Sequence, residues 1–80
     1  PGGGDFETRL DAQAAVIAAQ AIVALGDQGA ALAERIYALQ EARDNAQYER
    51  QKQEQQERLD RLLLFVQKMI ETVQDNPKFL

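Results

Sequence analysis

One short run interrupts an otherwise helical sequence, and it decides what the chain can fold into. The run is Gly26-Asp27-Gln28-Gly29, with an alanine-rich apolar segment before it and a long, increasingly charged segment after it. Glycine and proline are sparse elsewhere between residues 5 and 76, and sparse punctuation favours long helices. No stretch shows the alternation of apolar and polar residues that is typical of a strand. The sequence therefore predicts an all-α protein.

Two architectures are compatible with this interruption. In the first, Gly26 ends helix one in the left-handed conformation that glycine adopts at low cost, and Asp27 caps helix two. The result is an antiparallel helical hairpin, which is the arrangement that we favour. The alternative is one long continuous helix, because apolar residues keep a heptad spacing through the interruption, from Ala15 to Leu39. Two glycines inside that helix would cost roughly 2 kcal/mol.

The expected elements form a single helical domain over residues 5–80. Residues 1–4, Pro-Gly-Gly-Gly, are interpreted as a linker or cloning remnant. We predict helix one over about residues 5–25, the turn over residues 26–29 and helix two over about residues 30–75; Asn76-Pro77 then ends the helix and leaves a tail, residues 76–80. Helix two would measure roughly 70 Å and helix one roughly 30 Å. The second half of helix two would then lack a partner, which predicts assembly into a coiled coil or helical bundle.

The last segment of the chain is the clearest amphipathic one. Its apolar residues follow a heptad seam over residues 59–73, with polar residues on the opposite face. Because an exposed apolar stripe of this size is rare on soluble monomers, we predict that the seam is an intermolecular contact. Tyr48 is a further candidate, since tyrosine is enriched at binding hot spots. The residues expected at helix–helix interfaces are Leu32, Ile36, Leu39, Tyr48, Leu59, Leu62, Leu63, Val66, Met69, Ile70 and Val73, and those expected at the turn are Gly26, Asp27 and Gly29.

Composition argues against catalysis. The chain has no cysteine and no histidine, so it lacks a thiol nucleophile, an imidazole base and the Glu-x-x-His motif of helical carboxylate metal sites. Its carboxylates are expected on solvated helix faces, where Glu54 with Arg58 and Glu57 with Arg61 have the spacing of stabilising ion pairs. We predict no enzyme activity, no catalytic residue, no metal and no cofactor.

Charge and hydropathy also bear on partners and location. The net charge is −4 and no basic block stands apart from the acids, so we expect no nucleic-acid binding. The most apolar window, residues 14–25, is shorter than the ~20 residues needed to cross a bilayer. It lacks the flanking basic residues of an interfacial membrane helix, and no basic segment typical of a signal peptide precedes it. A cytoplasmic location is the default expectation.

Four short matches resemble the RebB-type "killing trait" proteins, the small helical subunits of bacterial R-bodies. They are Leu25-Gly26-Asp27, Ala30-Ala31, Ile36-Tyr37 and Gln55-Gln56, and they fall within residues 18–56. Members of that family usually carry a proline in the break and few charges, whereas Gly29 stands near that place here and the following segment is heavily charged. The resemblance implies a self-assembling structural subunit and transfers no functional residue.

Two functions are compatible with these features. The first is a structural or assembly subunit that forms a homo-oligomer by helix–helix self-association. The second is a small acidic helical chaperone or adaptor whose apolar seam binds a partner helix.

Overall fold

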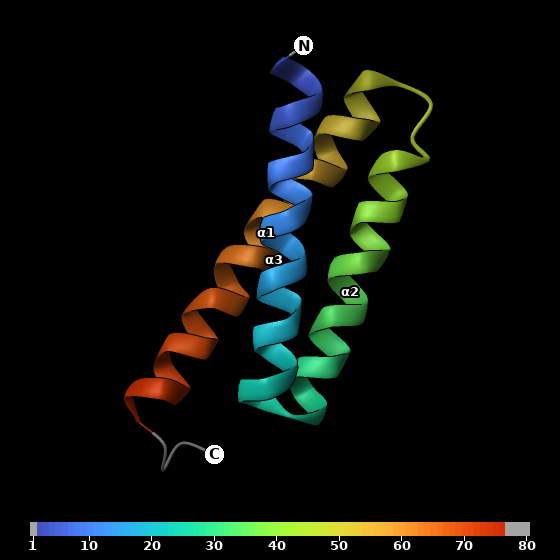
Figure 1. Cartoon of the computed structure of the whole chain (residues 1–80). Helices are drawn as coiled ribbons and strands as arrows, with labels where there is room; N and C mark the ends of the chain where they lie inside the picture. Colours follow the sequence, from blue (N-terminus) through green and yellow to red (C-terminus); the bar gives the residue numbers. More distant parts are fainter. Residues whose placement is uncertain (1, 77–80) are drawn as a thin grey trace.

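Three α-helices make up the fold in the computed structural model, which describes residues 2–76, with side chains from residue 11 onward. α1 spans Gly2–Leu25, α2 spans Asp27–Asp44 and α3 spans Glu49–Asp75. Each helix packs against both others in one bundle (Figure 1). Within the described residues there is no strand, so the all-α prediction is confirmed. Gly2 begins α1, so the expected linker is helical from Gly2 onward; Pro1 and the tail after Asn76 lie outside the described residues.

The first turn lies at Gly26, where the chain reverses and brings α2 alongside α1 (Figure 1). Gly26 has φ 61° and ψ −129°. The positive φ favours glycine, as predicted, but the ψ value differs from that of the left-handed helical conformation that was expected. Its N–H donates to the carbonyl of Ile22 at 3.1 Å, and its own carbonyl accepts from the N–H of Ala30 at 2.9 Å. This confirms the turn at Gly26 and excludes one helix that continues through it.

The turn is shorter than the four residues that were predicted. Asp27 is the first residue of α2 rather than its cap, since Gly26 occupies the cap position. Gly29 lies inside α2 and is buried against α1. A Cβ added to Gly29 would lie 2.9 Å from the backbone nitrogen of Ile22 and still closer to the carbonyl of Ala21. Gly29 therefore serves the close approach of two helices and not the reversal of the chain.

A second turn contradicts the prediction of one helix over residues 30–75. α2 ends at Asp44, and the chain becomes extended at Tyr48, with φ −117° and ψ 143°, before α3 begins. The N–H of Asn45 closes α2 by donating to the carbonyl of Glu41 at 2.9 Å. Aspartate and asparagine favour such a break because their short side chains compete for backbone hydrogen bonds. A single helix of roughly 70 Å would expose the apolar seam of residues 59–73 to water. Because the second turn folds α3 back onto α1 and α2, this seam is buried instead.

The core forms where the three helices meet. α1 contributes mainly alanines, which allow its neighbours to approach closely, while α3 contributes larger side chains. Burying each of these larger side chains contributes about 1.5–3 kcal/mol. None of the helices, over the described residues, combines the length and the apolar character needed to cross a bilayer. The buried apolar residues are Ala14, Ile17, Ala18, Ala21, Leu25, Ala33, Ile36, Leu59, Val66, Ile70 and Val73.

Candidate functional site

Most of the residues predicted at intermolecular interfaces lie in or against the core of the bundle and not on its surface. Five of them are buried, five are half-buried against the same core, and Tyr48 alone is well exposed, at 67%. The seam over residues 59–73 therefore has its partners within the same molecule, because α3 packs on α1 and α2. This removes the premise on which the seam was predicted to be intermolecular. The buried five are Ile36, Leu59, Val66, Ile70 and Val73, and the half-buried five are Leu32, Leu39, Leu62, Leu63 and Met69.

A polar cluster around Arg43 joins all three helices. Arg43 is only 8% exposed, and its guanidinium donates to Asp11 of α1 at 2.9 Å and to Gln56 of α3 at 2.8 Å. It also donates to its neighbour Asp44 at 3.0 Å. Gln40 adds a weaker bond to Asp11 at 3.3 Å. The cluster fixes the relative positions of the three helices near the second turn.

The charge state of Arg43 follows from these contacts. Burial alone would lower the pKa of Arg43, but its hydrogen bonds and charge attraction to Asp11 and Asp44 outweigh burial and raise that pKa above the ordinary value. A cation with a raised pKa remains charged at every ordinary pH. No buried side-chain nitrogen or oxygen lacks a partner among the described residues. The contacts of Arg43 with Asp11 and Gln56 hold the three helices together at this end of the bundle.

Potential metal ligands do not converge in the described part of the chain. No group of three or more carboxylates there is close enough to hold a metal ion. Two other surface features of the described residues bear on function: an uncharged face of α1, and a groove between α2 and α3.

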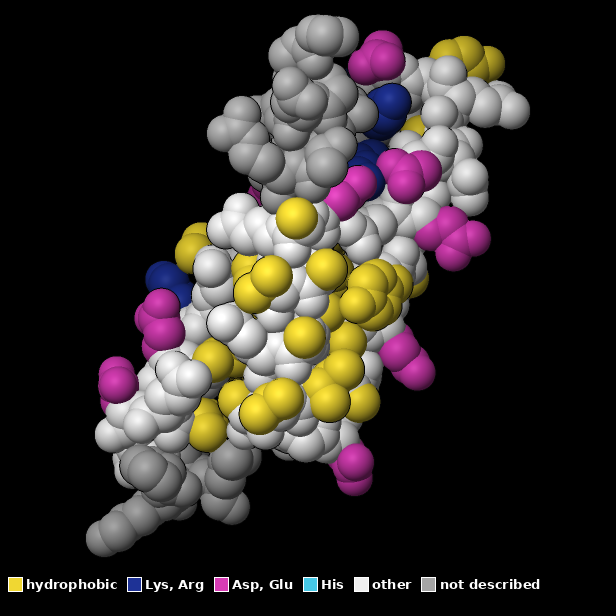
Figure 2. All heavy atoms as spheres, viewed as in Figure 1, with side chains coloured by type: hydrophobic (Ala, Val, Ile, Leu, Met, Phe, Trp, Pro, Cys, Tyr) yellow, Lys and Arg dark blue, Asp and Glu magenta, His cyan; other side chains and the backbone are white. Residues whose placement is uncertain are grey.

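The exposed face of α1 is free of charge from residue 12 to residue 26. Three large apolar side chains stand out on it, with Val23 87%, Val16 54% and Ile22 48% exposed. Figure 2 shows hydrophobic side chains gathered over this part of the molecule, with acidic and basic side chains at its margins. Apolar residues of this size are common singly on surfaces, whereas their grouping on one uncharged face makes this face a candidate contact site. Sequence reasoning missed this face, although the absence of any charge between Asp11 and Asp27 was a readable signal.

Comparisons with protein-family models, curated proteins and solved structures found no match to this chain. The resemblance to RebB-type proteins stays a prediction.

Proposed function

We propose that this chain is a non-catalytic helical protein that self-associates through the uncharged face of α1. The observation that carries the proposal is the exposure of Val23, which is 87% exposed within a segment without charge. A monomer would leave this side chain and its apolar neighbours in water. Pairing with a second copy would bury them without placing any charged side chain in the contact.

The spacing of the face supports pairing with an antiparallel copy of itself. Ala12, Val16, Ala19 and Val23 are all exposed and follow a four-three-four spacing, which is a short heptad seam. In an antiparallel pair whose two-fold axis passes between residues 17 and 18, Val16 meets Ala19 of the other copy and Val23 meets Ala12. Each large side chain then faces a small one, which is the condition for close packing across a two-fold interface.

The residues beside the seam support the same arrangement. Ala15 and Ile22 lie on one side of it, and both are exposed. Gln13 and Gln20 lie on the other side and are exposed as well. In the antiparallel register the apolar flank faces the apolar flank, and the glutamines face each other. No like charges oppose one another, whereas they would on most other faces of this acidic chain.

The extent of the face sets the expected strength of association. It covers about four helical turns, so it buries less than the roughly 800 Å² per partner of a standard interface. We expect a dissociation constant in the micromolar range or weaker, equivalent to roughly 8 kcal/mol or less.

Sedimentation velocity over micromolar to millimolar concentrations tests the proposal. The wild type should shift from monomer to dimer, and Val23→Glu should abolish the shift because symmetry buries the new charge twice. Gln53→Glu is the matched control, since it adds the same charge at an exposed position of α3 and should leave dimerisation unchanged. A wild type that stays monomeric at millimolar concentration, or equal effects of the two variants, would refute the proposal.

Cross-linking tests the register. The chain has no cysteine, so the double variant Ala12→Cys with Val23→Cys introduces the only thiols. Within one helix these positions are roughly 16 Å apart and cannot form a disulfide. Oxidation should therefore give covalent dimers through Cys pairs between copies. Each single variant should cross-link far more slowly.

The resemblance of residues 18–56 to RebB-type subunits points to the same class of function, a self-assembling structural protein. The second candidate function is an adaptor that binds a partner helix. The observation that favours it is the groove between α2 and α3.

A further inference from the structure

A groove runs between α2 and α3 and continues along α3. Two adjoining hollows of about 450 and 400 Å³ lie between the two helices, and a third of about 370 Å³, lined by α3 alone, adjoins them. The first two share Arg35 and Phe65, and the last two share Phe65 and Met69. From Arg58 to Val73 the α3 side of the groove measures roughly 22 Å, or about four helical turns.

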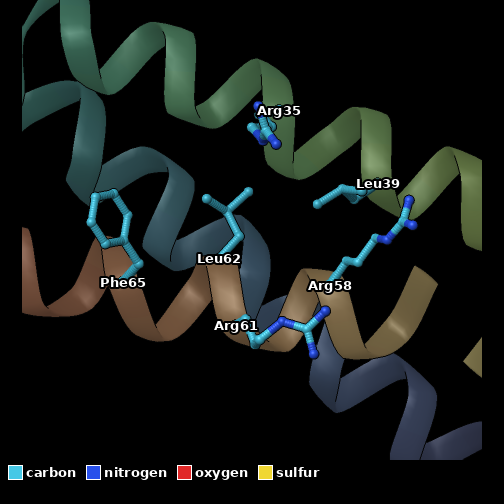
Figure 3. A pocket seen from close by; sticks show the side chains of 6 residues that line it. All are labelled: Arg35, Leu39, Arg58, Arg61, Leu62 and Phe65. Carbon is cyan, nitrogen blue, oxygen red and sulfur yellow. The ribbon is translucent and has the colours of Figure 1, made fainter. Parts of the chain in front are cut away.

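The lining combines an apolar row with cations. Leu39 reaches into the first hollow from α2, and Leu62 and Phe65 rise toward it from α3 (Figure 3). Phe65 is 55% exposed at the junction of all three hollows. The cations that line the groove are Arg35, Arg58 and Arg61 at one end and Lys68 at the other. Among the described residues that line it there is no aspartate or glutamate.

Arg58 and Arg61 lack the ion pairs that the sequence predicts for them. Glu54 is paired with Arg50, at 3.7 Å, instead of the expected Arg58. Glu57 forms no ion pair with Arg61 within the described residues. In contrast, Arg43 is held by Asp11 and Asp44. The chain has a net charge of −4, and among the described residues every cation without a carboxylate partner except Lys52 lines this one groove.

We infer that this groove binds an amphipathic helix of a partner protein, one that carries glutamate or aspartate beside its apolar face. Leu39, Leu62, Phe65 and Met69 would receive the apolar residues of that helix, which converts the three-helix bundle into a four-helix one. The arginines at the rim would pair bidentately with its carboxylates. A nucleic-acid backbone would satisfy the arginines but leave the apolar row in water, and a flat membrane surface does not fill a groove. The inference does not rest on self-association through α1.

The size and charge of the groove define the partner helix. The groove is long enough for a helix of about 15 residues, at 1.5 Å per residue. Its apolar residues would recur at i, i+4 and i+7, the spacing with which one helix face lies along a groove. Its acids would concentrate at the end that lies against Arg35, Arg58 and Arg61.

Fluorescence anisotropy with a labelled peptide tests the inference. The probe is a helix-forming peptide of about 16 residues with leucines at i, i+4, i+7 and i+11 and glutamates beside them. Its matched control has glutamine in place of every glutamate. The acidic peptide should bind the wild type about tenfold more tightly than the glutamine peptide.

Variants of the protein separate the groove from general charge effects. Arg58→Glu combined with Arg61→Glu should weaken binding of the acidic peptide about tenfold or more, and Phe65→Ala should weaken both peptides. Arg50→Glu is the control for reversal of one charge elsewhere on α3, because Arg50 is an exposed arginine outside the groove, and it should change affinity less than about twofold. Circular dichroism verifies that each variant is folded. We expect all of them to fold, because the replaced side chains are exposed.

Three outcomes would overturn the inference. The first is equal binding of the acidic and glutamine peptides, or an equal loss with Arg50→Glu. The second is binding of phosphatidylserine vesicles that depends on Arg58 and Arg61 when neither peptide binds, which would assign the groove to a membrane surface. The third is a loss of dimer in sedimentation when Arg58 and Arg61 are both replaced by Glu, together with no loss of dimer in Val23→Glu. That result would assign the groove to a second copy of the chain.

Discussion

Replacing Gly29 with alanine tests the closest contact between α1 and α2. In an exposed helix this substitution stabilises by about 1 kcal/mol, because alanine is the better helix former. Here the new methyl group would lie 2.9 Å from the backbone nitrogen of Ile22 and closer still to the carbonyl of Ala21. Both are backbone atoms of a neighbouring helix, so no side-chain rotation can relieve the contact. We expect Gly29→Ala to destabilise the protein.

The magnitude follows from how far the helices must move. An ordinary methyl contact lies near 3.5–4.0 Å, so α1 and α2 must separate by roughly 1 Å or more at this point. Overpacking of this kind costs about 1–3 kcal/mol, and the alanine-rich core nearby loses contacts as the helices part. Subtracting the gain of about 1 kcal/mol in helix propensity leaves a net loss of up to about 2 kcal/mol. For a domain of this size that loss lowers the Tm by up to roughly 15 °C.

Thermal unfolding by circular dichroism measures the effect. Ala30→Gly is the matched control, because Ala30 is the exposed neighbour of Gly29 in α2 and reports helix propensity alone. It should lower stability by about 1 kcal/mol. If Gly29→Ala instead raises the Tm by as much as Ala30→Gly lowers it, the close approach of the two helices is wrong.

Three further predictions concern stability. Gly26→Ala should lower the free energy of unfolding by about 1–3 kcal/mol. Nothing lies within 4 Å of the added methyl group, so this loss comes from the backbone conformation alone, φ 61° and ψ −129°, which is nearly exclusive to glycine; an unchanged midpoint in urea would contradict this. Arg43→Met should lower the free energy of unfolding by about 1–2 kcal/mol. This is less than the loss expected on breaking a fully buried ion pair, because Asp11 is half-exposed and stays hydrated; an unchanged midpoint in urea would contradict this. Ile36→Ala should cost about 2–5 kcal/mol, whereas Leu64→Ala, at a side chain 55% exposed, should cost under about 1 kcal/mol; similar midpoints would place Ile36 outside the core.

The helical content and the first turn could be predicted from the sequence because their causes are local. Gly26 marks a backbone conformation that other residues avoid, and the structure has φ 61° there. The second turn was missed because it contains neither glycine nor proline. Asp44-Asn45 was the available signal, as both side chains compete with helical hydrogen bonds. The seam over residues 59–73 was also out of register with the apolar residues upstream, which is what a break in the helix produces.

The interaction surfaces were harder to predict because they depend on that second turn. With one long helix, Leu59 and Val66 had no partner and were expected to be intermolecular; with the turn, they fill the core. The same reversal brings Arg35 of α2 into one hollow with Arg58 and Arg61 of α3. No spacing along the sequence encodes that proximity, since it arises only after residues 45–48 have turned the chain.

The position of Arg43 has a consequence for the handedness of the bundle. Once α1 and α2 have paired, α3 could lie on either side of the hairpin. Arg43 is two residues before the second turn and, in the observed topology, contacts Asp11 and Gln56 at the same time, which favours this topology. We expect Arg43→Met to populate the other topology as well as to lower stability, as buried polar groups can do when they specify one packing among several. A second set of amide resonances in the NMR spectrum of that variant would reveal the mirror arrangement, and a single set would show that the apolar core alone selects the handedness.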